Sequence, residues 1–306
     1  MPGWLVTGGS GFLGRHAMEV LAPEGDVVAL GRKCPPGWDP RRFVAGDLER
    51  AETIERALDL VQPDRIIHAS GKTPPADSDQ LYRSNTCATR NLIQALEEQG
   101  RSVRLVIVGS AAELGPVKVE DLPVGEDHPC RPVDGYGVSK WLATAAGLSA
   151  RPPLEVVAAR VFNPIGPGQP SSQVFGRFAE RLLSSEPGPI VVGDVETRRD
   201  FIDVRDVARA LVALALSGEV GRVYHVGTGQ SHRVRDGLER LIRSSGRTIE
   251  IRVDPGRTGA SGPRDSRADI QRIMNDTGWR PQIEWERSLG DLWRAAQAEA
   301  RLPLTA

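Results

Sequence analysis

The residues with the clearest chemical potential are a tyrosine and a lysine four positions apart, Tyr136 and Lys140 in the segment VDGYGVSKWLA (133–143). On a helix, side chains at this spacing lie on one face, one turn apart. A phenol has an ordinary pKa of about 10, and a neighbouring ammonium group lowers that pKa by favouring the phenolate. The pair predicts a general acid or base for a hydroxyl or carbonyl group. The alternative is an amphipathic helix with a half-buried tyrosine and a solvated lysine.

A third candidate is Ser110, which ends the apolar run RLVIVGS (104–110). Ligands of open α/β sheets bind just outside the carboxyl ends of the strands, where this hydroxyl would lie. A hydroxyl there can stabilise charge that develops on a reacting oxygen. A serine that only caps the strand end is the competing interpretation.

Apolar runs and helical patterns alternate over the first half of the chain. Predicted strands cover 4–8, 26–31, 65–70, 104–110 and 154–160, and predicted helices cover 12–22, 51–61, 80–99 and 135–149. Mostly apolar strands are typical of a parallel sheet covered by helices on both faces. We therefore expect an α/β fold with a doubly wound parallel sheet of the Rossmann type.

The pattern changes after Arg160, where FNPIGPGQPSS reads as a loop. Helical patterns follow at 174–185, 204–217, 233–245 and 286–300, with short apolar runs at 190–193, 223–226 and 249–253. We predict a dinucleotide-binding domain at 1–160 and a smaller α+β substrate-binding region at 161–306. Part of the second region, about 199–232, is expected to pack back on the first sheet.

Three glycines follow the first predicted strand, Gly8, Gly11 and Gly14 in VTGGSGFLGRH. A tight turn needs positive φ, and a pyrophosphate approaches a backbone closely only where no Cβ intervenes. The helix that follows offers free N–H groups and a positive dipole end. Strand, turn and helix in this order predict a dinucleotide site rather than an ordinary turn.

These motifs resemble those of the extended short-chain dehydrogenase/reductases, the NAD-dependent epimerase/dehydratase family. Further resemblances are GDL (46–48), HAS (68–70), NTCATRNLIQA (85–95, with Ala88 where glycine is usual) and RDFIDVRDVARAL (199–211). The resemblance implies a catalytic Ser110, Tyr136 and Lys140. It also implies a cofactor site made, besides Tyr136 and Lys140, of Gly8, Ser10, Gly11, Phe12, Leu13, Gly14, Arg32, Lys33, Asp47, Leu48, Ala69, Ser70, Gly71 and Asn85.

The end of the second predicted strand bears on the choice of cofactor. Members that use NAD place a carboxylate there for the adenosine ribose, whereas this chain has Gly31, Arg32 and Lys33. A guanidinium group suits a 2′-phosphate. NADP(H) is therefore favoured, and NAD(H) remains possible.

The residues after Ser110 bear on the reaction. Dehydratases of the family need an acid and a base next to the Ser or Thr, where this chain has Ala111 and Ala112. On an extended strand Glu113 would face the opposite side. His128 and Cys130 could form an epimerase pair but are expected to lie in a plain loop. In the family a tyrosine, here Leu114, helps to shape the sugar pocket.

The second half resembles the GDP-4-keto-6-deoxy-D-mannose reductases in RVFNPIGPGQ (160–169) and VGDVETRRDFIDVRDV (192–207). The resemblance implies a nucleotide-sugar substrate that is bound by Ser110, Asn163, Arg199 and either Arg264 or Arg257. Asp203 and Asp206 are interpreted as helix-start residues.

We therefore predict an oxidoreductase that transfers a hydride from NAD(P)H to the C4 keto group of a nucleotide-linked 4-keto-6-deoxy sugar. A nucleotide-sugar 4-epimerase with the same three residues is the alternative, and a regulatory protein that binds NADP without turnover is less favoured.

The composition excludes several classes of partner. Formal net charge is −1, from 39 basic and 40 acidic residues, which gives no reason to expect nucleic acid or an anionic membrane. The three cysteines are far apart and match neither a metal-binding spacing nor a disulfide framework. We therefore expect no metal and a reducing compartment. Without an apolar span or a signal peptide pattern, we predict a cytoplasmic protein. The helices at 80–99 and 135–149 resemble those that form dimer interfaces in the family, so a homodimer is expected.

Overall fold

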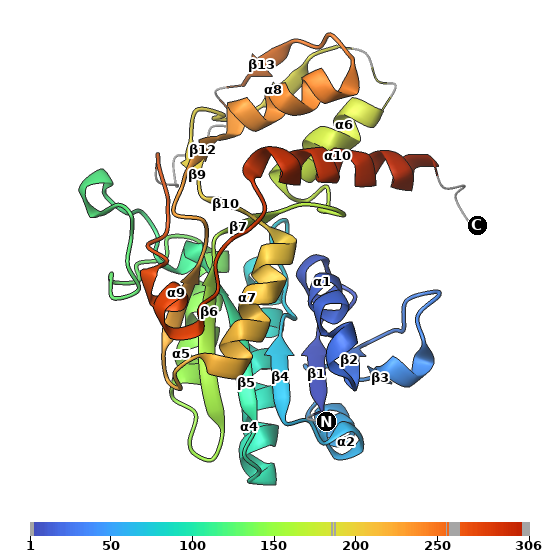
Figure 1. The fold of residues 1–306 in the computed structure, drawn as a ribbon, viewed down its shortest axis with the longest axis vertical. Coiled ribbons are helices and arrows are strands. Elements are labelled where there is room, and N and C mark those ends of the chain that lie inside the picture. Colours follow the sequence, from blue (N-terminus) through green and yellow to red (C-terminus); the bar gives the residue numbers. More distant parts are fainter. Residues whose placement is uncertain (1–2, 185, 187, 255, 257–263, 302–306) are drawn as a thin grey trace.

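The computed structural model describes residues 3–184, 186, 188–254, 256 and 264–301, and its centre is a seven-stranded sheet (Figure 1). The spatial order is β11-β6-β5-β4-β1-β2-β3, and every neighbouring pair is parallel. Strand order reverses between β1 and β4, which is where a doubly wound sheet opens a crevice for ligands. The strands are β1 (Trp4–Thr7), β2 (Val27–Gly31), β3 (Phe43–Ala45), β4 (Arg65–His68), β5 (Arg104–Ser110), β6 (Glu155–Val161) and β11 (Val223–Val226).

Helices cover both faces of this sheet. One face carries α1 (Phe12–Leu21) and α7 (Val204–Ser217), and the other carries α2 (Ala51–Val61), α4 (Ala88–Gln99) and α5 (Gly135–Leu148). A short α3 (Ser78–Leu81) and a π-helical turn η3 (Tyr82–Cys87) lead directly into α4. Two buried apolar clusters, one on each face, explain why the strands are apolar throughout instead of alternating.

A smaller part lies beyond the carboxyl ends of the strands, in the upper half of Figure 1. Its helices α6 (Val174–Leu183), α8 (Val234–Ser245) and α10 (Trp285–Arg301) enclose a third apolar cluster. The helix α9 (Gln271–Thr277) instead packs beside α7 and β11. Three two-stranded pairs complete this part: β7 (Asn163–Ile165) with β10 (Phe201–Asp203), β8 (Ile190–Val192) with β13 (Ile251–Val253), and β9 (Arg198–Arg199) with β12 (His232–Arg233).

The predicted doubly wound parallel sheet is confirmed, and several elements keep their predicted bounds, among them 51–61, 104–110, 204–217 and 223–226. The strands β3, β7, β9, β10 and β12 and the helix α9 were not predicted. They have two to seven residues each, too few to show a period. From the second half of the chain, β11 joins the central sheet and α7 packs on one of its faces. The division into two parts at residue 160 stays a prediction. No helix among the described residues combines the length and apolarity needed to cross a membrane.

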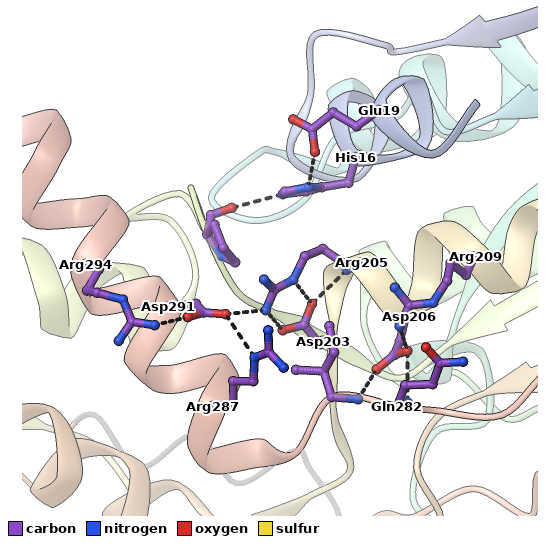
Figure 2. Close-up of polar contacts among 12 residues, drawn as sticks. His16, Glu19, Asp203, Arg205, Asp206, Arg209, Gln282, Arg287, Asp291 and Arg294 are labelled. Carbon is purple, nitrogen blue, oxygen red and sulfur yellow. Dashed lines mark hydrogen bonds and ion pairs between the residues drawn. The ribbon is translucent and has the colours of Figure 1, made fainter. Parts of the chain in front are cut away.

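Buried aspartates at the start of α7 tie the smaller part to the sheet (Figure 2). Asp203 caps α7 by accepting a hydrogen bond from the Arg205 backbone N–H at 2.8 Å, and the Arg205 guanidinium reaches Asp291 of α10 at 2.7 Å. Asp206, which has no exposed surface, accepts the backbone N–H groups of residues 282 and 283 at 3.0 and 2.8 Å and pairs with Arg209. Both aspartates start the helix as predicted, and Asp206 also anchors the segment that leads into α10.

We predict that Asp206→Ala lowers the free energy of unfolding by about 2–4 kcal/mol, because two buried N–H groups and Arg209 lose their partner. The matched control is Asp236→Ala on α8, which removes another Asp–Arg pair three residues apart, with Arg233 at 2.8 Å. That pair is exposed, so its loss is expected to change stability by less than about 0.5 kcal/mol. Urea unfolding of both variants provides the measurement, and equal losses would contradict the anchoring role of Asp206.

Candidate active site

A cleft of about 660 Å³ opens at the carboxyl ends of the central strands, next to the point where strand order reverses. It runs from the first turn of α1, past the ends of β4 and β5 and the start of α5, to the loop after β6 and to β10. Segments that are far apart in the sequence thus line the same cleft. Among the predicted site residues, those that line this cleft are Gly11, Phe12, Leu13, Gly14, Ala69, Ser70, Gly71, Ser110, Tyr136, Lys140, Asn163 and Arg199.

The turn between β1 and α1 brings the backbone close to the cleft. Gly8 has φ +70°, and a Cβ there would lie 2.8 Å from the Ser70 backbone. A Cβ on Gly14 would lie 2.0 Å from the Gly8 carbonyl oxygen, so the helix packs on the turn only because both residues are glycine. The first amides of α1 start at the cleft, and its N-terminal dipole end suits a pyrophosphate. Gly8 itself shapes the turn without lining the cleft, and Ser10 is exposed on the turn.

Ser110 and Tyr136 both line the cleft. Ser110 is the last residue of β5, and Tyr136 lies in the first turn of α5, which Asp134 caps by accepting the Gly137 N–H at 2.7 Å. Burial raises the pKa of the Tyr136 phenol, the nearby Ser110 hydroxyl opposes that rise, and the carboxylates of Glu113 and Asp134 add to it. The phenol therefore stays protonated around neutral pH.

Lys140 lies one turn further along α5, and its side chain is buried, with 8 % of its surface exposed. Its ammonium group donates a hydrogen bond to the carbonyl oxygen of Val108 in β5. Burial lowers the pKa of Lys140 to about 8, although the Glu113 carboxylate opposes this. The predicted effect of Lys140, a lowered pKa of Tyr136, is not what this arrangement shows, because the pKa of the phenol is raised by burial and the ammonium group is bound to Val108.

Asn85 supports the wall of the cleft from behind. It is buried in η3, and its amide accepts the Lys72 N–H at 2.7 Å and donates to the Lys72 carbonyl oxygen at 3.0 Å. It also donates to the Ser139 hydroxyl at 2.9 Å. Asn85 does not itself line the cleft but holds the loop after β4, which includes the cleft residue Gly71, against α5, and its predicted contact with the cofactor stays a prediction.

The residues predicted for the adenosine end of a dinucleotide follow β2 and β3. Arg32 and Lys33 are exposed just after β2, and neither side chain forms an ion pair with another described residue. Asp47 accepts the Glu49 N–H at 3.0 Å and remains part-exposed. Leu48 is different, since its side chain is buried in the apolar cluster under α2 and α4 and leaves only its backbone for a ligand.

The predicted substrate residues separate into two groups. Asn163 and Arg199 line the cleft, Asn163 donates to the Asp200 carbonyl oxygen at 3.0 Å, and burial lowers the pKa of Arg199. Arg264 does not line the cleft: its side chain is exposed, and its carbonyl oxygen accepts the Arg198 N–H at 2.8 Å. Arg257, the other candidate for this role, lies outside the described residues.

Asp200 is a site residue that the sequence interpretation missed. It is fully buried beside Arg199, and its carboxylate accepts the N–H groups of Thr228, Gly229 and Ala268 at 2.8, 3.0 and 3.1 Å. It thus holds the loop after β11 and the segment around Ala268 next to the cleft residue Arg199. The signal available in the sequence was the position of Asp200, a charged residue directly before the apolar pair Phe201 and Ile202.

The residues considered for other reactions lie as follows. Ala111 and Ala112 line the cleft, where a dehydratase would need an acid and a base. Glu113 is fully buried, but the reason differs from the prediction: residues 111–113 form a 3-10 turn (η4), not an extended strand. Neither Cys130 nor His128 lines the cleft. The Cys130 thiol lies 3.1 Å from the Arg160 guanidinium, and burial raises its pKa. The His128 ring is hydrogen-bonded to the carbonyl oxygen of Pro129.

Fold and cleft together define a dinucleotide-binding enzyme of the short-chain dehydrogenase/reductase type, with Ser, Tyr and Lys side chains at the ends of the central strands. Residues 4–227 match the NAD dependent epimerase/dehydratase family, and the chain belongs to that family. The predicted family and the predicted class, an NAD(P)-dependent enzyme of nucleotide-sugar chemistry, are confirmed.

Relatives of known activity resemble the chain over nearly its whole length. GDP-6-deoxy-D-mannose reductase of Pseudomonas aeruginosa is 34 % identical, with 93 % of each chain covered. dTDP-6-deoxy-L-talose 4-dehydrogenase (NAD(P)(+)) of Kitasatospora kifunensis is 32 % identical over 95 % of this chain and 94 % of that one. The solved structure of RMD from Pseudomonas aeruginosa complexed with NADPH superposes with a TM-score of 0.83 at 30 % identity, covering 98 % and 100 % of the two chains.

Lys140 generates a prediction on the protein without ligands. Its pKa is about 8 in the folded state and about 10.5 unfolded, so between these values the unfolded chain binds more protons and stability rises with pH. Below pH 8 the full penalty of a buried ammonium group remains. Lys140→Met is therefore expected to raise the melting temperature at pH 7 and to raise it less at pH 10. Melting curves at both pH values test this, and an equal gain at both would show that Lys140 is not desolvated.

Proposed function

We propose that the protein reduces the C4 keto group of a nucleotide-linked 4-keto-6-deoxy sugar, with NADPH as the hydride donor. The observation that carries the proposal is one cleft that brings Ser110, Tyr136 and Lys140 together, while Ala111 and Ala112 offer no further acid or base there. The names of the two relatives, one a GDP-6-deoxy sugar reductase and one a dTDP-6-deoxy sugar 4-dehydrogenase, support a 6-deoxy sugar and position 4.

Each of the three residues has a distinct task in this proposal. Tyr136 gives its proton to the carbonyl oxygen, as a general acid that is protonated at neutral pH. Ser110 holds the same oxygen by a hydrogen bond that strengthens as negative charge develops. Lys140 releases Val108 or shares its protons with the nicotinamide ribose, and its positive charge favours transfer of the phenol proton. NADPH, when bound, supplies the hydride.

The residues of the cleft fit such a cofactor. Gly8 and Gly14 let the turn and α1 pack closely on each other, and the first turn of α1, which lines the cleft, offers a pyrophosphate its amides. Lys140 and Tyr136 lie at the other end, where the nicotinamide ribose would be held. Arg32 and Lys33, which form no ion pair with another described residue, favour a 2′-phosphate, so NADP(H) is proposed over NAD(H).

A nucleotide-sugar 4-epimerase is the second candidate, because the same Ser110, Tyr136 and Lys140 can take a hydride from C4 and return it. The family name covers such enzymes. An epimerase must begin with a base, however, and burial works against a phenolate at Tyr136. A regulatory NADP-binding protein would have no reason to keep all three groups in contact with one cleft.

Cofactor preference is predicted to depend on Arg32. A charge-assisted contact with a 2′-phosphate contributes about 1.5–3 kcal/mol, so we expect NADPH to bind roughly tenfold to a hundredfold more tightly than NADH. Arg32→Ala should remove most of that preference and leave NADH affinity unchanged, because NADH has no group at that position. Fluorescence titration of both cofactors provides the measurement. Equal affinities in the wild type, or an unchanged preference in the variant, would contradict the proposed site.

The reaction itself is tested with GDP- and dTDP-4-keto-6-deoxy sugars. We expect stoichiometric loss of NADPH absorbance, with deuterium from labelled NADPH at C4 of the product. Tyr136→Phe should remove most turnover and leave cofactor affinity nearly unchanged, because only the hydroxyl group is lost. Conversion of a fully reduced sugar nucleotide to its C4 epimer without added cofactor would overturn the reductase in favour of the epimerase.

We also propose that the protein is a homodimer, with α4 and α5 at the interface. Apolar side chains that are exposed on this side are Tyr82, Val138 and Trp141, at 45, 38 and 40 % exposure. Val138 and Trp141 lie three residues apart on α5, on one face of the helix. A cytoplasmic location likewise stays a prediction.

A further inference from the structure

We propose that Glu113 is a positioning residue that joins the strand carrying Ser110 to the helix carrying Tyr136 and Lys140. The inference rests on the proposed roles of these three residues. Glu113 is fully buried, lies outside the cleft and cannot touch a substrate. Its carboxylate nevertheless has hydrogen-bond partners on three different elements.

The first partner is Ser110 itself. Glu113 Oε1 accepts the Ser110 backbone N–H at 2.7 Å, and the Ser110 hydroxyl accepts the Ala112 N–H at 3.2 Å. The two residues thus form a capping box around the 3-10 turn η4 (Ala111–Glu113). Glu113 fixes the backbone of Ser110 at the point where the strand ends, and with it the direction of the Ser110 hydroxyl.

The second partner lies on α5. The Thr144 hydroxyl donates to the same Oε1 atom at 3.1 Å, and Thr144 is buried one turn after Lys140 and two turns after Tyr136. One oxygen atom therefore receives a donor from the serine strand and a donor from the tyrosine helix. Any slip of α5 along the sheet would stretch this contact.

The third partner neutralises the buried charge. Glu113 Oε2 accepts Arg160 Nε at 3.1 Å, and the Arg160 guanidinium bonds His225 Nε2 and Cys130 Sγ, each at 3.1 Å. Gly109, Arg160 and His225 occupy paired positions on the adjacent strands β5, β6 and β11. A Cβ on Gly109 would lie 2.4 Å from Glu113 Oε1, so glycine at this position makes room for the carboxylate.

The charge of Glu113 also reaches the reacting groups. It favours the ammonium form of Lys140 and the protonated form of Tyr136. Without it, the phenol would lose its proton at a lower pH. The titratable or charged groups that bear on Glu113 or Tyr136 are Arg160 from β6, His225 from β11 behind Arg160, Cys130 from its loop, Tyr136 and Lys140 from α5, and Asp134 at the start of α5.

The geometric arm of the test uses Thr144, because its variants keep the buried ion pair. Thr144→Val should lower kcat by about tenfold with the KM for NADPH unchanged, since misalignment affects the reacting groups rather than binding. Thr144→Ser keeps the hydroxyl and should restore the wild-type rate. The control is Glu155→Gln, which removes an ion pair with Arg104 (3.0 Å) at the amino ends of β5 and β6, far from the cleft, and should leave kcat unchanged.

The electrostatic arm needs no substrate. The chain has three tyrosines, so ¹³C-labelled tyrosine gives few signals, and loss of one signal in Tyr136→Phe assigns Tyr136. In Glu113→Gln the Tyr136 signal should titrate at lower pH than in the wild type, while Tyr82 serves as internal reference. If Glu113→Gln does not fold, the double variant Glu113→Gln/Arg160→Met removes both charges and should show the same direction.

Wild-type kcat in Thr144→Val, or a Tyr136 that titrates at the wild-type pH without the Glu113 charge, would overturn the positioning role. Failure of the reductase proposal is a separate result. In that case the wild-type protein would not oxidise NADPH with any keto sugar, and the tyrosine titration would still decide the role of Glu113.

Discussion

The geometry of the site depends on one buried carboxylate, that of Glu113. Parallel strands end at one edge of the sheet, and there the backbone groups of β5 lose their ladder partners. Glu113 provides the missing acceptor for Ser110 and at the same time reaches α5 through Thr144. A charge in this place requires a counter-charge, which is why Arg160 stands in β6, whose other residues after Glu155 at its amino end are apolar. The presence of Arg160, a charged residue in a buried strand, is thus explained by its ion pair with Glu113.

Buried charges recur around the cleft, and their local cost is consistent with function. Lys140 and Arg199 are both held in surroundings that lower their pKa, although an apolar residue would pack there at less cost. Asp203 and Asp206, by contrast, are charges fully satisfied by backbone N–H groups and arginines, and they connect the two parts of the molecule. Charged groups whose pKa is lowered by burial thus line the cleft, whereas the aspartates with several hydrogen-bond partners lie where the two parts of the molecule meet.

Much of this arrangement could be predicted from the sequence, and the remainder has identifiable reasons. Long apolar runs and periodic helices gave the sheet and its layers, because burial on both faces leaves a continuous signal. The Gly8–Gly14 turn was found because close backbone approach permits only glycine. Residues that act through their partners were not found: Asp200 and Glu113 take their meaning from loops and strands that are distant in the sequence. The contact of Asn85 with Lys72 was not foreseen for the same reason, and its predicted role at the cofactor stays a prediction.

The relation between Tyr136 and Lys140 shows what a spacing of four can and cannot say. The spacing places both side chains on one face of α5. It does not bring the ammonium group against the phenol, because that group is hydrogen-bonded to the Val108 carbonyl oxygen. With that competition and with burial, the phenol keeps its proton. A protonated phenol beside a hydroxyl that can hold the same oxygen is arranged to give a proton, whereas an enzyme that starts by oxidising an alcohol must take one. The raised pKa of Tyr136 is therefore in keeping with its proposed role as a proton donor.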